Sequence, residues 1–183
     1  MLQQGYSPTA ADVAFIRRHQ NKTFTSTTVL GDMTINFIDT SARGCCGARK
    51  WLKSFHDAPL VVFTYDMASY DHIEVDGFVY MHETLALFES IAKGKLLQNT
   101  YIALLLLNIT EFRSKLTKSP LSRIYPEYTG GDDPGAASHY ILEKFLQLAG
   151  ERNICHHFAD LFDQSIVDFL ARTAKDAMLN RQG

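Results

Sequence analysis

The residues best placed to do chemistry lie in one stretch of the chain, from Ile35 to Tyr70. An apolar segment with strand character ends there at Asp39, and a loop rich in small residues follows it. A carboxylate at the carboxyl end of a strand that opens into a loop and a helix is typical of α/β sheets that bind a ligand. The alternative is an ordinary strand–loop–helix unit with Asp39 on its surface, and this stretch alone leaves both readings open.

A basic segment in the same stretch is a candidate surface for binding a protein partner. Arg49, Lys50 and Lys53 surround the single tryptophan, Trp51. A tryptophan among basic side chains is a composition typical of protein-binding hot spots. In the alternative reading, Trp51 packs into the core while the charged side chains stay in solvent.

Length and composition predict one soluble domain. The chain has 183 residues, of which 46% are hydrophobic and 21% charged, close to the average of globular domains. A net charge of -2 gives no electrostatic basis for binding nucleic acid. The three cysteines form no disulfide framework, and the longest apolar run, Tyr101 to Leu107, is far shorter than the roughly 20 residues of a membrane helix. We therefore expect a cytoplasmic chain without a transmembrane segment.

The elements that must position these residues alternate between strands and helices. A hairpin is predicted from Phe24 to Leu30 and from Met33 to Ile38, with Gly31-Asp32 at its turn. Hydrophobic runs and periodicity then predict three strands and three helices in alternation, at Pro59–Phe63, Met81–Lys93, Tyr101–Leu107, Gly135–Leu148, Ile154–Phe158 and Phe162–Leu179. This order predicts an α/β fold with a mostly parallel sheet, in which Tyr101–Leu107 is a central strand covered on both faces.

Three details of these helices can be predicted. Asp133 is expected near the N-terminal cap of the helix that follows it. Tyr140, Phe145 and Leu148 are expected as core contacts of that helix. The last helix carries one apolar stripe, made of Phe162, Ile166, Phe169 and Leu170.

The order and spacing of several segments resemble the Ras-like domain of heterotrimeric G-protein alpha subunits. The segments are YSPTAADV, ARKWLKSFHDAPLVVF, MHETLALFESIAKGKLLQNTYIALLLLN, SPLSRIYPEYTG, ICHHF and FDQSIVDFLARTAKDAML. The resemblance implies a Ras-like, mostly parallel sheet flanked by helices and incomplete at its N-terminal strand. Residues 1–22 would then be a remnant of the linker between the helical domain and switch I, and residues 23–183 a partial Ras-like G domain.

The resemblance also implies an activity, cofactors and partners. Members of the family bind GTP or GDP with Mg²⁺, hydrolyse GTP, and signal from G-protein-coupled receptors to effectors together with a beta-gamma dimer. The basic segment with Arg49, Lys50, Trp51 and Lys53 matches the second switch helix, which contacts beta-gamma and effectors. Such partners would bring the chain to the inner face of the plasma membrane.

Residues matching the family's phosphate and magnesium positions are altered. The arginine that stabilises the transferring phosphoryl group matches Arg17, and the threonine that ligates magnesium matches Gln20. Asp39 keeps the carboxylate of the magnesium shell, Ala42 replaces the glycine that meets the γ-phosphate, and Arg43 stands in place of the catalytic glutamine. A P-loop pattern, GxxxxGK followed by Ser or Thr, does not occur in the sequence.

The guanine-recognition motif NKxD is replaced by the run from Asn108 to Glu111. Asn108 would still reach a purine edge, and Glu111 would offer a carboxylate to the guanine N–H groups, whereas Ile109 lacks the lysine stem that covers the base.

Two hypotheses follow for the function of the whole chain. The chain is either a G-protein alpha-like switch with impaired nucleotide chemistry, or a nucleotide-free interaction module that competes for beta-gamma, receptor or effector surfaces. A fragment that folds poorly, because its sheet has unpaired edges, is a third possibility.

Overall fold

The computed structural model describes residues 23–30, 33–40, 57–74, 77 and 79–179. The chain divides into two compact units, residues 1–51 and residues 52–183, and each unit is described by itself.

The first unit contains the predicted hairpin. Strands β1 (Thr23–Leu30) and β2 (Met33–Thr40) pair in antiparallel register, with Thr27 opposite Asn36. The hydroxyl of Thr27 donates a hydrogen bond to the Asn36 side-chain oxygen at 2.7 Å across this pair. The hairpin is confirmed, and β2 runs two residues beyond the predicted end.

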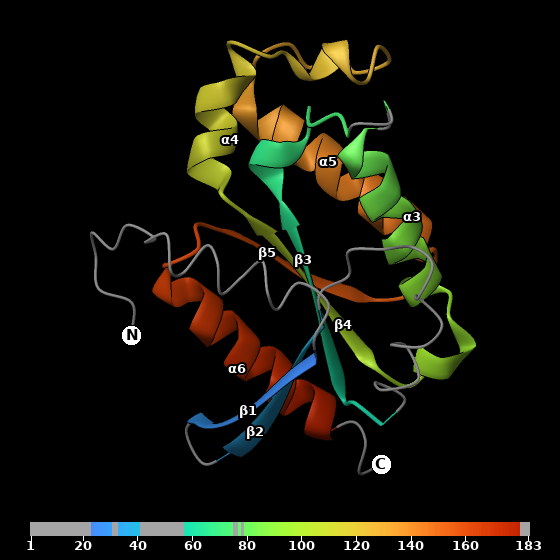
Figure 1. Ribbon diagram of the computed structural model, residues 1–183, viewed down its shortest axis with the longest axis vertical. Helices are drawn as coiled ribbons and strands as arrows, with labels where there is room; N and C mark the ends of the chain where they lie inside the picture. The colour runs from blue at the N-terminus through green and yellow to red at the C-terminus, as the bar shows by residue number, and fades with distance from the viewer. Residues whose placement is uncertain (1–22, 31–32, 41–56, 75–76, 78, 180–183) are drawn as a thin grey trace. The chain divides into compact units, whose positions relative to one another are not determined.

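The second unit is built on a three-stranded parallel sheet in the order β3-β4-β5, shown in Figure 1. The strands are β3 (Leu60–Asp66), β4 (Tyr101–Leu107) and β5 (Ile154–Ala159). All five inner residues of β4 are buried, as expected for a central strand between two covered faces. The mixed α/β fold with a parallel sheet is therefore confirmed.

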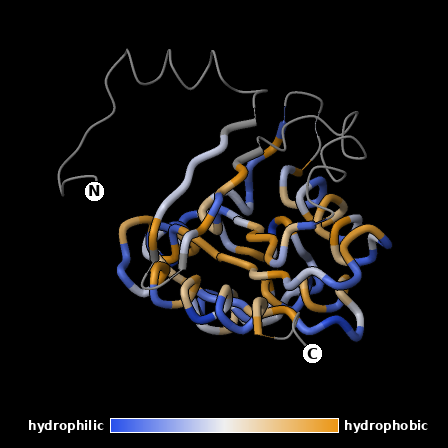
Figure 2. The backbone as a smooth tube through the Cα atoms, turned by 90° about the horizontal axis from the view of Figure 1, so that it is seen from below, coloured by the Kyte–Doolittle hydropathy of each residue, from blue (hydrophilic) through white to orange (hydrophobic). Residues whose placement is uncertain are grey.

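Helices cover both faces of this sheet (Figure 1). On one face, Phe63 of β3 contacts Phe88 of α3 (Tyr80–Ala92) and Phe145 of α5 (Pro134–Ala149). On the other face, Phe169 of α6 (Gln164–Leu179) joins a cluster of apolar side chains from the three strands. Figure 2 shows hydrophobic residues following the strands through the interior of this unit, while hydrophilic stretches lie at its periphery. In the described part of the chain, no helix is long and apolar enough to span a bilayer.

Helix α4 (Ile109–Leu116), directly after β4, was not predicted. Its buried residues Ile109, Phe112 and Leu116 have helical spacing, so the sequence carries a helical signal in the segment where the guanine-recognition motif lies. The described residues of this unit also form three single-turn 3₁₀ helices: η3 (Met67–Ser69), η4 (Lys95–Leu97) and η5 (Leu121–Arg123).

Two predicted boundaries are wrong, the end of β3 and the start of the last helix, α6. Strand β3 continues to Asp66 instead of ending at Phe63, so it carries a carboxylate at its end. The last helix begins at Gln164, and Phe162 is 73% exposed instead of belonging to the apolar stripe. The reason is local, because the Asp163 carboxylate accepts the Ser165 N–H at 2.8 Å and thereby fixes the first turn of α6.

Other predictions about the helices can be compared directly. The Asp133 side chain caps α5 by accepting the Ala136 N–H at 2.6 Å, as predicted. Phe145 is fully buried. Tyr140 and Leu148 are only partly buried, because they lie at the margin of the packed face of α5 and not at its centre.

Candidate functional site

The carboxyl edge of the parallel sheet brings together three polar residues that are far apart in the sequence. Asp66 ends β3, Asn108 follows β4 and Asp160 follows β5. The register pairs Asp66 with Leu107 and Leu107 with Ala159, so these strands end at the same level. This edge is where open α/β sheets bind their ligands.

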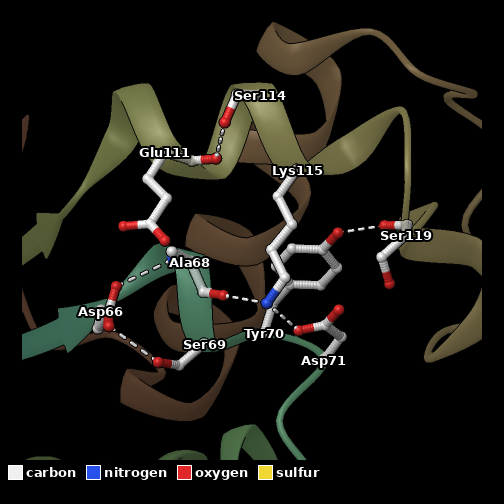
Figure 3. A network of polar contacts seen from close by, with 9 residues as sticks. All are labelled: Asp66, Ala68, Ser69, Tyr70, Asp71, Glu111, Ser114, Lys115 and Ser119. Carbon is white, nitrogen blue, oxygen red and sulfur yellow. Dashed lines mark hydrogen bonds and ion pairs between the residues drawn. The ribbon is translucent and has the colours of Figure 1, made fainter.

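Asp66 accepts hydrogen bonds from several groups at this edge, and those from Ala68 and Ser69 are drawn in Figure 3. Its Oδ1 accepts the Ala68 N–H at 3.0 Å and the Asn108 Nδ2–H at 2.9 Å, and its Oδ2 accepts the Ser69 hydroxyl at 2.8 Å. The carboxylate therefore caps η3 and holds the side chain of Asn108 at the same time.

Asn108 has a left-handed backbone conformation, with φ 59° and ψ 41°. It is the only residue other than glycine with positive φ among the described residues. Asparagine tolerates this region better than most residues, although the conformation is sparsely populated and is enriched at functional sites. The conformation turns the chain sharply from β4 into α4 and leaves the Asn108 amide beside Asp66.

The N-terminus of α4 is occupied by a second carboxylate. Asp160 accepts the Thr110 N–H at 3.1 Å through Oδ1 and the Thr110 hydroxyl at 2.5 Å through Oδ2. Free N–H groups at a helix N-terminus are a common place for anions, and here the chain supplies its own anion.

An open cavity of about 460 Å³ lies beside this edge. Its walls come from the end of β3, η3, the loop after η3 and the outer side of α4, and its lining residues are Asp66, Ala68, Ser69, Asp71, His72, Ile73, Glu111 and Lys115. Figure 3 shows the Glu111 carboxylate directed from α4 toward Ala68 and Asp66.

Lys115 holds the far wall of the cavity in place. Its Nζ donates to the Ala68 carbonyl at 2.8 Å and to an Asp71 carboxylate oxygen, and it lies 5.5 Å from the centre of the Tyr70 ring. Partial burial disfavours the charged form of Asp71, but the hydrogen bonds from Lys115, Ser119 and the backbone together with the positive charge of Lys115 more than offset it, and they hold the pKa of Asp71 below its usual value. The Tyr70 hydroxyl donates to the Ser119 carbonyl, so η3 is tied both to the last turn of α4, through Lys115, and to the residues that follow α4.

Only part of the predicted site falls on this edge. Asn108 and Glu111 lie here, as the family motif implies. Asp39 belongs to β2 in the first unit, where its backbone pairs with Phe24, and its side chain lies outside the described residues. The remaining predicted residues also lie outside the described residues, namely Arg17, Gln20, Ala42, Arg43, Arg49, Lys50, Trp51 and Lys53.

The carboxylates that organise the edge, Asp66 and Asp160, were missed. Each lies at the carboxyl end of a strand, as Asp39 does in the predicted hairpin. The sequence pattern predicts a strand that ends at Phe63, and it therefore does not place Asp66 at a strand end.

A second polar cluster joins the loop before α5 to that helix. Glu127 accepts the Tyr140 hydroxyl at 2.7 Å and the Lys144 Nζ–H at 3.0 Å through the same oxygen. The Lys144 ammonium lies 4.8 Å from the Tyr140 ring centre and 5.2 Å from that of Tyr125. Hydrogen bonding, first from Tyr140, then from the backbone and from Lys144, lowers the pKa of Glu127 from 4.5 to about 2.

This cluster predicts a pH-dependent contribution of Glu127 to stability. A carboxyl whose pKa is lower in the folded state stabilises that state above its unfolded pKa, and loses this contribution as the pH falls through the folded pKa. The melting temperature of the parent chain should therefore exceed that of Glu127→Gln above pH 4.5, and the difference should vanish as the pH falls toward about 2. Thermal melts at pH 6, 4, 3 and ~2 measure this difference.

The matched control is Glu143→Gln, which changes an exposed glutamate of α5. A Glu127→Gln difference that is the same at every pH, or no larger than that of the control, would contradict the assignment.

Comparison with known proteins agrees with the geometry of the sheet. The family model described as G-protein alpha subunit matches residues 1–178. The guanine nucleotide-binding protein subunit alpha of Emericella nidulans is 30% identical over a match that covers 98% of this chain and 52% of the relative. The G-protein complex alpha subunit gpaA of Aspergillus fumigatus matches at the same identity and coverage.

A third relative, the guanine nucleotide-binding protein alpha-1 subunit of Neurospora crassa, is 30% identical over 95% of this chain and 50% of its own length. The chain thus spans about half the length of the curated relatives it matches. The parallel sheet with helices on both faces fits the Ras-like domain that the resemblance implied. Since the family model covers nearly the whole chain, this protein belongs to the G-protein alpha-subunit family.

Proposed function

We propose that this chain is a G-protein alpha-like signalling protein that acts through its protein-binding surfaces and binds guanine nucleotide weakly. Family membership supports the signalling role. The proposed partners are those of the family: a beta-gamma dimer, a G-protein-coupled receptor and an effector. GTP or GDP with Mg²⁺ would be the cofactors, and the roles of Arg17, Gln20, Asp39, Ala42 and Arg43 toward them remain predictions.

One hydrogen bond carries the proposal of weak nucleotide binding. The Asn108 amide, which the family motif directs to the purine, donates to Asp66 at 2.9 Å. Turning Asn108 toward a base would remove a donor from a partly buried carboxylate, and hydrogen bonds to charged groups contribute about 1.5–3 kcal/mol. Such a loss would lower the affinity by roughly ten- to a hundred-fold.

The neighbouring residues support the same conclusion. Ile109 stands where the family has a lysine that covers the base, and its side chain is buried with an exposed fraction of 8%. Thr110 is engaged by Asp160 through both its N–H and its hydroxyl. Glu111 therefore supplies the carboxylate of the motif to the cavity lining. The side-chain amide of Asn108, and the N–H and hydroxyl of Thr110, already have partners within the chain.

A second candidate function, a nucleotide-free interaction module, rests on the same contacts. In this case the chain would compete for beta-gamma, receptor or effector surfaces without any nucleotide control. The two candidates differ in one measurable property, the dependence of partner binding on nucleotide.

The test is capture of a beta-gamma dimer by the immobilised chain, without nucleotide, with GDP, and with a non-hydrolysable GTP analogue in Mg²⁺. At micromolar nucleotide we expect equal capture in the three conditions, because weak binding leaves the nucleotide site empty. At much higher concentrations of the GTP analogue, capture should change if the chain binds nucleotide weakly, whereas the nucleotide-free module would show no change. Capture by Trp51→Ala should be lower in every condition, because the variant lacks the large side chain of the proposed partner surface. Calorimetric titration of the same protein with GDP should show no binding in the micromolar range.

Lys175→Ala, on the exposed side of α6, is the control for loss of a single surface side chain. Circular dichroism of each variant establishes that it is folded. GDP binding at micromolar concentration or tighter would overturn the proposal of weak nucleotide binding. Absence of beta-gamma capture by the folded parent, or equal capture by parent and Trp51→Ala, would overturn the proposed partner surface.

A further inference from the structure

The carboxylate of Asp66 is held in place by groups other than Asn108. Its two oxygens accept the Ala68 N–H at 3.0 Å and the Ser69 hydroxyl at 2.8 Å, and both donors belong to η3, which Asp66 caps. A carboxylate held by such neighbours is preorganised, so it loses little rotamer freedom when it accepts a further hydrogen bond. The Asn108 amide, which donates to it at 2.9 Å, therefore has a fixed partner within the second unit itself.

The bond to Asp66 sets the direction of the whole Asn108 amide. An asparagine side chain has two N–H donors and one acceptor oxygen in a single plane. Because one N–H is bonded to Asp66, the other N–H and the oxygen have a defined direction as well. A purine base can use this amide only from that direction, or after the bond to Asp66 has broken.

A different contact supports the backbone of Asn108. Its carbonyl oxygen accepts the Phe112 N–H at 2.9 Å, in the first turn of α4, and the residue follows directly after β4. The left-handed turn between strand and helix therefore keeps a backbone support when the side-chain contact is lost. Release of the amide and loss of the turn are separate events.

Asp66 lies at the wall of the cavity beside this edge. In the part of the chain that the structure describes, the lining includes Asp66 and Glu111 but not Asn108. Figure 3 shows the two carboxylates on neighbouring elements, at the end of β3 and on α4. The cavity of about 460 Å³ falls in the size range of small-molecule sites. A ligand in this cavity meets Asp66 while the Asn108 amide is still bonded to it.

We infer, on the basis of the proposed function, that Asp66 competes with a purine base for the Asn108 amide and so inhibits nucleotide binding from within the chain. The base-binding part of the site is then retained but occupied, and it is not lost. Removing the competitor raises the affinity for a purine nucleotide, and the gain requires Asn108. Its size is that of a hydrogen bond to a charged group, roughly ten- to a hundred-fold in affinity.

The test compares GDP binding by Asp66→Ser and by the parent chain. Serine keeps an oxygen that can cap η3, but it removes the charged acceptor of the Asn108 amide. Titration with GDP in Mg²⁺, followed by ligand-observed NMR up to millimolar concentrations, gives the dissociation constants. We expect Asp66→Ser to bind GDP about ten-fold more tightly than the parent, or better. The double variant Asp66→Ser/Asn108→Ala should lose this gain.

Two comparisons separate release of the amide from removal of a negative charge. Inorganic pyrophosphate has no base, so its affinity should be the same for Asp66→Ser and the parent. Asp132→Ala, which removes an exposed carboxylate of the loop before α5, should leave GDP binding unchanged. Asp66→Asn is the second variant if Asp66→Ser does not fold by circular dichroism, and its neutral acceptor should give a smaller gain that again requires Asn108.

The outcomes distinguish this inference from the proposed function. Equal GDP affinities for the parent and a folded Asp66 variant would overturn the inference alone and leave weak binding by the parent in place. A gain that persists without Asn108, or that extends to pyrophosphate, would do the same. Binding of GDP by the parent at micromolar concentration or tighter would overturn the proposed function, and the inference with it, because the Asp66 contact would then not inhibit.

Discussion

Replacing Phe145 by alanine is expected to lower the free energy of unfolding by about 4 kcal/mol. Phe145 is fully buried, and its ring lies 5.2 Å from that of Phe88, 5.3 Å from that of Tyr65 and 6.2 Å from that of Phe63. The substitution removes the apolar area of the ring and leaves a cavity between α5, α3 and β3 that rigid neighbours fill poorly. Urea denaturation of the second unit, followed by circular dichroism, measures the loss.

The matched control is Phe162→Ala, because Phe162 is a phenylalanine of the same size that is 73% exposed. Its loss should change the free energy of unfolding by less than about 0.5 kcal/mol, as for other surface substitutions. Similar losses for the two variants would show that Phe145 is not part of the core of this unit.

Asp66→Ala is expected to cost about 3 kcal/mol, mostly through the carboxyl edge of the sheet. The substitution removes the acceptor of three hydrogen bonds, from the Ala68 N–H, the Ser69 hydroxyl and the Asn108 amide. It also takes away the side-chain contact that holds Asn108 in its left-handed conformation. Hydrogen exchange of the amides of η3 and the first turn of α4 locates the loss, and urea denaturation gives its size.

Asp132→Ala is the control, because Asp132 is an exposed carboxylate of the loop before α5. Asp66→Asn provides a second comparison, since it keeps a side-chain oxygen for one of the three donors and should lose only part of the stability. If Asp66→Ala were as stable as Asp132→Ala, Asp66 would not be the residue that organises this edge.

Elements with a strong local signal could be predicted from the sequence. The run YIALLLL is continuously apolar and rich in leucine, and it forms the buried central strand β4. Met81 and Phe88, at helical spacing, are both fully buried in α3. The boundaries that failed depend on single side chains, such as Asp163, whose capping bond begins α6 two residues later than its apolar pattern.

The candidate site was predictable only in part. Asn108 and Glu111 could be proposed because they follow a recognisable motif after a strand. Their partners could not, because the Asn108–Asp66 bond joins residues 42 positions apart and the Thr110–Asp160 bond joins residues 50 positions apart. Such contacts depend on the parallel register that aligns three strand ends, and local sequence patterns carry no information about them.

The hydrogen bonds around η3 and α4 also bear on how this unit loses its structure. Asp66, Lys115 and Tyr70 connect η3 to the start of α4, to its last turn and to the residues after it. Neither element can therefore separate from the sheet without breaking contacts of the other. We therefore expect local unfolding of this corner to be a single cooperative event, in which η3 and α4 open and close together. A protease or a partner that binds either η3 or α4 in an extended form would bind only after both elements have separated from the sheet.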